Sequence, residues 1–558
     1  MDTHDYTKGP RTHLVYPERT MFQMIEQVAK EYPGEPAYEF YGMKTSFGSF
    51  VRRIEAAAKG LKALGIGTGD RVTICLPNIP QAVDSFYAVN RLGATCNMIH
   101  PLSAEAEITW YLTCAKSPLI ITVDMFYEKV KKAVEAVKHP VRIVAVRIQD
   151  ELPGILAPLY ALRTGRPYLK YPQGTDLLYR KMLANGLSQT LPEAEYDPER
   201  TAAILYSGGT TGKPKGVCLT DLNFNALGME ARESIDQQFR PGLTILACMP
   251  MFHGFGLGIN IHTVLMYGVS CILMPSFNIR TYSRMLLKKR PSFIAGVPTL
   301  FDALLRADAL KNADLSHLQG MFCGGDSLSV ELKKRVDAFL REHGADIQVR
   351  EGYGLTECVT ASCLTPKDVY REHSIGLPFP DIVYDIVKPG TDETVPRGAE
   401  GEIVLKGPTL MQGYLDEPEE TAKALRRRSD GDIWLYTGDM GRMDEDGYVY
   451  FLYRIKRMII TNGYNVYPAI LEEVLDRQEG VDSSCVIGIP DERRGQRIRA
   501  CVILKEGVPE TAETKERLME GMRREVAKYA LPKEIVFRKE FPKTLVGKIA
   551  YHQLEEEN

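Results

Sequence analysis

Apolar positions in the first 240 residues follow two different spacings. Segments 22–32 and 50–65 repeat apolar side chains every three to four residues, which is the spacing of a helix with one buried face. Short apolar runs at 71–77 and 117–123 suit strands buried on both sides of a sheet. Helices that alternate with buried strands predict layered α/β structure.

The pattern changes twice toward the C-terminus. From 381 to 453 short strands alternate with turns, which predicts a β-rich sub-lobe. After Lys456 we expect helices at 469–477 and 521–529 among strands at 457–461, 484–490, 500–505 and 534–537. The predicted organisation is therefore a large N-terminal domain of layered α/β sub-lobes over 1–454 and a small α+β domain over 455–558.

One long uncharged stretch has the length of a membrane span. Residues 244–275 contain no Asp, Glu, Lys or Arg. The stretch also holds Pro250, His253, His262 and four glycines, and its Val- and Ile-rich pieces fit buried strands and a core helix better. We therefore expect these residues to lie in a protein core.

Composition and charge narrow the class of protein. The chain has 558 residues, 44% of them apolar and 25% charged, which is typical of a multidomain globular protein. Its net charge of −3 gives no bulk attraction to nucleic acid. The 11 cysteines form no paired metal or disulfide motif, and no apolar signal segment opens the chain. These features predict a reducing, cytoplasmic setting.

An insert interrupts the α/β alternation between about 150 and 186. Within 151–181, leucines, tyrosines and basic residues surround four prolines. Two interpretations stay open. The insert is either a partly packed surface excursion or, around 163–170, a basic aromatic patch that rests on a membrane surface.

The loop from Tyr206 to Gly216 is the densest chemical motif. Its glycines let the backbone approach an anion, its hydroxyls donate to phosphate oxygens, and its lysines neutralise charge; these residues are Ser207, Gly208, Gly209, Thr210, Thr211, Lys213 and Lys215. It is not a Walker A loop, because Pro214 stands where that motif needs Ser or Thr. A flexible turn has no use for three hydroxyls and two lysines, so the loop predicts phosphate binding.

This loop resembles the signature of the adenylate-forming superfamily, which includes acyl-CoA synthetases, peptide-synthetase adenylation domains and beetle luciferases. Four further motifs of that family follow in order: Tyr353-Gly-Leu-Thr-Glu357, Thr437-Gly-Asp439, Arg454 and Gly547-Lys548-Ile549. The resemblance covers essentially the whole chain. It implies a small C-terminal domain that is mobile, an active site between the domains, and ATP, Mg²⁺ and coenzyme A as cofactors and co-substrates.

The resemblance also assigns the nucleotide site residue by residue. Asp439 accepts hydrogen bonds from the ribose hydroxyls and Arg454 donates to the nucleotide. Tyr353 offers a flat face to adenine, Thr356 a hydroxyl to the α-phosphate, and Gly324 and Gly354 stand in nucleotide-binding turns. Glu357, together with Thr210, supplies hard oxygen ligands for Mg²⁺.

Lys548 corresponds to the family's catalytic lysine, whose ammonium stabilises the transition state as pyrophosphate leaves. Acetylation would remove that charge. Lys456 corresponds to the hinge, and Gly463 leaves room for the pantetheine arm of coenzyme A in the loop 461–468. Tyr453 departs from the family pattern, in which many members have Gly or Asp before the arginine.

The resemblance places the acyl pocket at 250–256, after 324–327 and around Tyr353, with His253 as the gating residue at its mouth. Residues 247–258 contain no Asp to pair an amino group, which disfavours amino acids. The motifs look most like bacterial medium- and long-chain fatty acyl-CoA synthetases. We therefore expect a fatty acid and ATP to give an acyl-adenylate and pyrophosphate, and coenzyme A to take the acyl group as a thioester.

Other readings of the same motifs stay open. An aryl or bile-acid-type CoA ligase, a ligase that loads a carrier protein in trans, and a luciferase-like enzyme share the adenylation residues. A non-catalytic nucleotide-binding protein would lose reactive residues that this chain keeps, among them Lys548, Glu357 and Asp439. The expected partners are the carboxylic acid, ATP and coenzyme A. Peripheral contact with the inner membrane face and a homodimer are left open.

Overall fold

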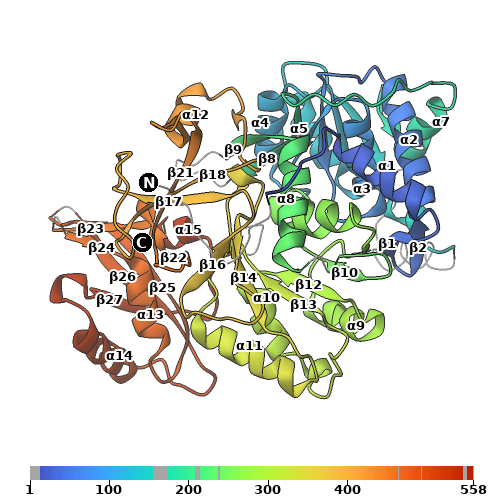
Figure 1. Cartoon of the computed structure of the whole chain (residues 1–558). Coiled ribbons are helices and arrows are strands. Elements are labelled where there is room, and N and C mark those ends of the chain that lie inside the picture. The colour runs from blue at the N-terminus through green and yellow to red at the C-terminus, as the bar shows by residue number, and fades with distance from the viewer. Residues whose placement is uncertain are drawn as a thin grey trace. The chain divides into compact units, whose positions relative to one another are not determined.

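The computed structural model describes residues 13–154, 172–207, 214–236, 239–462, 464–491, 493–543 and 549–556 (Figure 1). The chain divides into two compact units. The larger unit comprises 1–383 and 405–435, and the smaller unit comprises 384–404 and 436–558. These units are defined by their compactness. The predicted boundary between 454 and 455 instead separates the part of the chain that is expected to move, and it stays a prediction.

The larger unit contains an eight-stranded sheet in the order β19-β9-β8-β4-β3-β5-β6-β7. Its strands are β3 (Arg71–Cys75), β4 (Thr95–Met98), β5 (Leu119–Val123), β6 (Arg142–Val146), β7 (Leu177–Leu178), β8 (Thr201–Ser207), β9 (Lys215–Thr220) and β19 (Gly413–Tyr414). The strands from β8 to β7 are parallel, whereas β9 and β19 join antiparallel. The runs predicted at 71–77 and 117–123 are confirmed as β3 and β5.

Helices connect and flank these strands. They are α1 (Met21–Glu31), α2 (Phe47–Ala63), α3 (Pro80–Arg91), α4 (Glu105–Ala115), α5 (Tyr127–Glu135), α7 (Tyr179–Asn185) and α8 (Asp221–Ser234). The amphipathic segments 22–32 and 50–65 are confirmed as α1 and α2. Each begins after a hydroxyl cap, since Thr20 and Ser46 accept backbone N–H bonds from the first turn.

A second sheet of the larger unit runs in the order β16-β15-β14-β13-β12-β10-β11-β1-β2. Its strands are β1 (Pro36–Phe40), β2 (Met43–Ser46), β10 (Thr244–Ala247), β11 (Ser270–Leu273), β12 (Phe293–Gly296), β13 (Gly320–Cys323), β14 (Val349–Tyr353), β15 (Cys363–Leu364) and β16 (Ser374–Pro378). From β14 to β1 every neighbouring pair is parallel. The carboxyl ends of these strands therefore share one edge, where parallel α/β sheets bind their ligands.

Three helices accompany this sheet, α9 (Ile279–Lys289), α10 (Pro298–Leu305) and α11 (Val330–Glu342). The uncharged stretch 244–275 folds as β10, a π-helix over Phe255–Thr263, and β11, and most of its side chains are buried. This confirms the expectation of buried strands and a core helix. Within the described ranges, no helix has both the length and the apolarity needed to cross a membrane.

The chain passes between the units through β17 (Val383–Val387), β18 (Gly401–Lys406) and β21 (Ile433–Met443), and α12 (Pro418–Ala424) and β20 (Leu425–Arg427) lie in the larger unit. The smaller unit continues with β22 (Val449–Arg454), β23 (Ile459–Thr461), β24 (Tyr464–Val466), β25 (Val481–Asp491), β26 (Gly495–Leu504) and β27 (Glu534–Phe537), together with α13 (Pro468–Asp476), α14 (Ala512–Glu525) and α15 (Tyr551–Glu556). Leu471 and Leu475 of α13 share a core with Leu518 and Met522 of α14.

The helix expected at 521–529 is misplaced. It begins at Ala512, where the Thr511 hydroxyl accepts the N–H of Thr514, and it ends at Glu525 before a 3-10 turn over Lys528–Ala530. The prediction failed because this first turn is almost entirely polar, so apolar periodicity did not mark the start.

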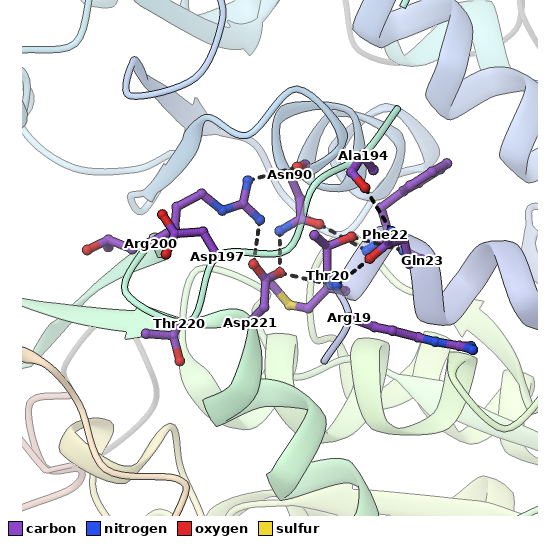
Figure 2. A network of polar contacts seen from close by, with 12 residues as sticks. Arg19, Thr20, Phe22, Gln23, Asn90, Ala194, Asp197, Arg200, Thr220 and Asp221 are labelled. Atoms are coloured by element: carbon purple, nitrogen blue, oxygen red, sulfur yellow. Dashed lines mark hydrogen bonds and ion pairs between the residues drawn. The ribbon is translucent and has the colours of Figure 1, made fainter. Parts of the chain in front are cut away.

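A buried polar network ties three helices of the larger unit together (Figure 2). The fully buried Asp221 begins α8 and forms an ion pair with Arg200. It also accepts hydrogen bonds from Asn90 Nδ2 at 2.7 Å and from the N–H of Met21 at 2.8 Å, while Asn90 Oδ1 accepts from Phe22 N–H at 2.9 Å. One carboxylate of α8 thereby binds groups of α1 and α3. This network positions helices and is distinct from the candidate site.

Candidate active site

Glu357 is held from two directions. It lies in a 3-10 turn, Thr356–Cys358, just beyond β14. The phenol of Tyr414 in β19 donates to Glu357 Oε1 at 2.8 Å, and the N–H of Met411 donates to the Glu357 carbonyl at 2.8 Å. A residue of the eight-stranded sheet therefore fixes a carboxylate that follows the second sheet.

Lys215 is linked to the same structure. Its ammonium forms an ion pair with Glu420 of α12 and lies 4.9 Å from the centre of the Tyr414 ring. Hydrogen bonds from Lys215 and Lys423 hold the pKa of Glu420 near 2, well below its ordinary value. Lys215 thus anchors the downstream end of the phosphate-loop motif to α12 and β19.

The upstream end of that motif is equally well fixed. Ser207 is the last residue of β8, and the phenol of the preceding Tyr206 donates to Asn97 Oδ1 at 2.8 Å. Gly208, Gly209, Thr210 and Thr211 lie outside the described residues. The residues on either side of the motif are cross-strand neighbours. Ser207 at the end of β8 pairs with Lys215 at the start of β9 in antiparallel register.

Gly324, Tyr353 and Gly354 stand at the carboxyl ends of two adjacent parallel strands. Gly324 follows β13 and donates its N–H to the Gly296 carbonyl at 3.1 Å. Tyr353 ends β14, and its carbonyl accepts the N–H of Ser362 at 2.9 Å. A Cβ atom at Gly354 would lie 2.1 Å from the carbonyl oxygen of Thr360, so this turn requires glycine.

The predicted acyl segment is held by a residue that the sequence did not single out. Buried Asn78 donates to the carbonyls of Ala247 and Met249 at 3.1 and 2.8 Å, and its Oδ1 accepts the N–H of Met251 at 3.0 Å. His253 lies two residues further on, partly buried. Its Nδ1 accepts the N–H of Phe255 at 3.2 Å, which places the neutral ring's proton on Nε2.

Asp439 and Arg454 face each other in the smaller unit. They are paired residues of β21 and β22, and Arg454 Nε lies 3.1 Å from Asp439 Oδ1. Asp439 is fully buried, whereas 47% of the Arg454 side chain is exposed. The preceding Gly438 has a φ of +71° and donates its N–H to Glu402 Oε1 at 3.0 Å. The arrangement offers a rigid carboxylate beside a more accessible guanidinium.

The predicted hinge lies just beyond this pair. Lys456 is in a 3-10 turn, Ile455–Arg457. The unusual Tyr453 is buried and stacks on Tyr467, with ring centres 3.9 Å apart and planes inclined by 24°. Packing against Tyr467 therefore accounts for a tyrosine at this position. Gly463 and Lys548 lie outside the described residues.

The chemistry of the described groups fits a magnesium ion that arrives with its nucleotide. Among the residues that the structure describes, no three His, Cys, Asp or Glu side chains gather to form a metal cage. Glu357 would provide one hard oxygen ligand, and a Mg²⁺ ion held by one carboxylate and by substrate phosphates would need no further protein ligand.

Comparison with known families gives the same assignment as the motifs. The AMP-binding enzyme family matches residues 25–415, and the AMP-binding enzyme C-terminal domain matches residues 471–548. The chain belongs to the AMP-binding enzyme family, which confirms the predicted resemblance and fold class.

Two full-length relatives and one solved structure define the nearer similarity. A long-chain-fatty-acid–CoA ligase of Bacillus subtilis is 35% identical over 99% of this chain and 97% of that protein. An Escherichia coli protein of the same name is 31% identical over 97% and 96%. The ATP-bound MatB of Rhodopseudomonas palustris is 25% identical with a TM-score of 0.81, covering 96% of this chain and 99% of that one. The predicted enzyme class, an AMP-forming acid–thiol ligase, is confirmed.

Proposed function

We propose that this chain activates a fatty acid with ATP and transfers the acyl group to coenzyme A. The observation that carries the proposal is the Tyr414–Glu357 contact, which fixes a hard carboxylate where Gly324, Tyr353 and Gly354 end two parallel strands. The Asp439–Arg454 pair of the smaller unit supplies the groups that a ribose requires.

Each residue has a defined task in the first half-reaction. A carboxylate oxygen of the acid attacks the α-phosphorus, the bond to the bridging oxygen breaks, and pyrophosphate leaves. Glu357 and Thr210 would hold Mg²⁺, which would supply positive charge to the phosphates when bound. Ser207, Thr211 and Lys215 border the phosphates, and Thr356 donates to the α-phosphate. Lys548 stabilises the charge that develops on the α-phosphate in the transition state.

The second half-reaction uses the same acyl-adenylate. The coenzyme A thiol loses its proton to solvent and the sulfur attacks the acyl carbon, so that a C–S bond forms, the C–O bond to the phosphate breaks, and AMP leaves. We propose that the C-terminal domain rotates about a hinge at Lys456. The rotation would remove Lys548 from the active site and bring in the 461–468 loop, where Gly463 would leave space for the pantetheine arm.

Fatty acids are favoured by two observations. Relatives that match nearly the whole chain are named long-chain-fatty-acid–CoA ligases. The segment that Asn78 holds is apolar and lacks an acidic residue between 247 and 258, which suits an alkyl chain and not an amino group. His253 would stand at the mouth of this pocket. The patch at 163–170, proposed as a membrane contact, lies outside the described residues, and the homodimer stays untested.

The test is pyrophosphate release from ATP across fatty, aryl and amino acids, with product masses read with and without coenzyme A. With coenzyme A present, we expect a fatty acid to give acyl-CoA. Without coenzyme A, we expect only the acyl-adenylate. An adenylate that persists with coenzyme A present would point to a carrier protein as acceptor. Preference for an aryl acid would contradict the proposed substrate.

A further inference from the structure

The turn between β1 and β2 holds a tyrosine in a backbone conformation that is unfavourable for a bulky residue. Phe40 pairs with Met43, which leaves Tyr41 and Gly42 as a two-residue turn with φ values of +47° and +90°. Such turns favour Asn or Asp followed by Gly, because bulky residues resist a positive φ. Tyr41 is nevertheless 50% exposed and Met43 is 52% exposed. The turn therefore keeps an aromatic side chain in solvent where a smaller polar residue would be less strained.

Helix α9 adds a basic stripe beside this hairpin. Arg280, Arg284 and Lys288 are exposed and spaced by four residues, so they lie on one face, whereas Tyr282 and Leu286 are buried on the other. Lys289 of the same helix forms an ion pair with Glu39 of β1, which fixes the helix against the hairpin. Figure 1 shows both elements on the same side of the larger unit.

The charge of this surface is unbalanced. The sequence has no Asp or Glu between Asp236 and Asp302, nor between Glu39 and Glu55. Within the described ranges, no carboxylate lies within ion-pair distance of Lys44, Arg280, Arg284 or Lys288. Phe277, just before α9, is 43% exposed. The hairpin and the segment 277–288 therefore both carry exposed basic and exposed apolar side chains.

The position of this surface relates it to the site. β10, β11 and β1 are parallel neighbours, so the turn at Tyr41 and the loop at Phe277 leave the same sheet edge as the 250–256 acyl segment. Aromatic and Met side chains at the depth of the headgroups, flanked by Lys and Arg, bind anionic bilayers by burial of apolar surface and by charge.

We propose that the hairpin–α9 surface, defined by Tyr41, Met43, Lys44, Phe277, Arg280, Arg284 and Lys288, docks on an anionic phospholipid bilayer. A lipid surface is favoured over an acidic protein because the surface adjoins the edge at which an alkyl chain would be taken up. The choice of a lipid surface therefore rests on the proposed fatty-acid substrate.

The experiment is sedimentation of the full-length protein with vesicles, without ATP, acid or coenzyme A. Vesicles of phosphatidylcholine alone are compared with vesicles that contain about 30 mol % phosphatidylglycerol. The variant R280E/R284E/K288E should lose binding to the anionic vesicles by about tenfold or more. The control K505E/R517E/R524E reverses three exposed charges of the smaller unit and should bind like the wild type.

Two substitutions test the apolar contacts. Tyr41→Asn suits the turn better and should retain or raise thermal stability, yet it should weaken vesicle binding about threefold. Phe277→Trp should show a blue-shifted emission that brominated anionic lipids quench, whereas a tryptophan at the exposed Val369 should not. These probes remain informative if the triple variant fails to fold.

Equal binding of the wild type and R280E/R284E/K288E, equal binding to neutral vesicles, or no binding by the wild type would overturn the proposal. A protein that binds vesicles but forms no acyl-CoA would refute the proposed function alone, and the reverse would refute the docking alone.

Discussion

The phenol of Tyr414 donates a 2.8 Å hydrogen bond to Oε1 of Glu357, and the ring of Tyr414 lies beneath the ammonium of Lys215. One tyrosine therefore contacts both the proposed magnesium ligand and the lysine that ends the phosphate loop. A charge-assisted hydrogen bond of this kind restricts the carboxylate to one orientation before any ion binds. We therefore predict that Tyr414 positions Glu357 for the first half-reaction.

Tyr414→Phe should keep the ring beside Lys215 while it removes the hydrogen bond to Glu357. We expect kcat for adenylate formation to fall about tenfold, because a hydrogen bond to a charged group contributes roughly 1.5–3 kcal/mol. The apparent affinity for Mg²⁺ should also fall, and excess Mg²⁺ should restore part of the rate.

The matched control is Tyr450→Phe, which removes a 3.0 Å hydrogen bond from a phenol to Asp444 in the smaller unit. Its activity and Mg²⁺ dependence should match the wild type. If Tyr414→Phe showed a normal Mg²⁺ titration, Glu357 would not depend on Tyr414 for its position.

Asp439→Asn tests the ribose site. The change preserves the size of a fully buried side chain but removes the charge that faces Arg454 across β21 and β22. We expect kcat/KM for ATP to fall about a hundredfold, since the change would weaken both the proposed ribose contact and the ion pair with Arg454. Asp444→Asn, in the turn after β21, should leave kcat/KM unchanged. Equal kcat/KM values for Asp439→Asn and the wild type would place the ribose elsewhere.

The sequence predicted this fold well where apolar spacing is regular. The buried strands β3 and β5 and the amphipathic α1 and α2 were all predictable, because burial of one face or of a whole strand leaves a period in the sequence. The start of α14 was not, because its first turn owes its position to the Thr511 cap and not to an apolar stripe.

The proposed site residues carry a different kind of signal in the sequence. Gly354 and Glu357 belong to one short motif in which glycine, hydroxyl and carboxylate residues stand at fixed spacing. Such a motif can be recognised from a single segment of the sequence. Asn78 and Tyr414 were missed as supports because their partners lie more than 50 residues away in the sequence. Each pair joins a residue of the eight-stranded sheet or its loops to a residue that follows a strand of the second sheet, so only tertiary packing brings the partners together, and local spacing carries no record of it.

Lys548→Ala should separate the two half-reactions. If Lys548 stabilises the transition state of adenylate formation, acid-dependent pyrophosphate release should fall by about a thousandfold. Thioester formation from supplied acyl-adenylate and coenzyme A should change only a few-fold, because the proposed hinge motion would withdraw Lys548 before that step. Lys543→Ala is the control nearby. Equal losses in both steps would instead indicate a structural role for this lysine.

Glu351 should make stability fall as the pH rises. Burial raises the pKa of this carboxyl from 4.5 to about 7, although the hydrogen bond from the N–H of Leu328 acts in the opposite direction. Between these two pH values the folded protein binds a proton that the unfolded chain has released. The free energy of unfolding therefore decreases through this window and levels off above it.

Glu351→Gln removes that titration. The variant should match the wild type near pH 5 and be more stable by roughly 2 kcal/mol near pH 8, measured by urea unfolding followed by circular dichroism. Asp476, whose pKa burial also raises to about 7, contributes a separate slope in the smaller unit, and Asp476→Asn is the matched comparison. A Glu351→Gln protein with an undiminished loss of stability between pH 5 and 8 would show that Glu351 is ionised in the folded state, in which case the site motif would carry a second negative charge beside Glu357.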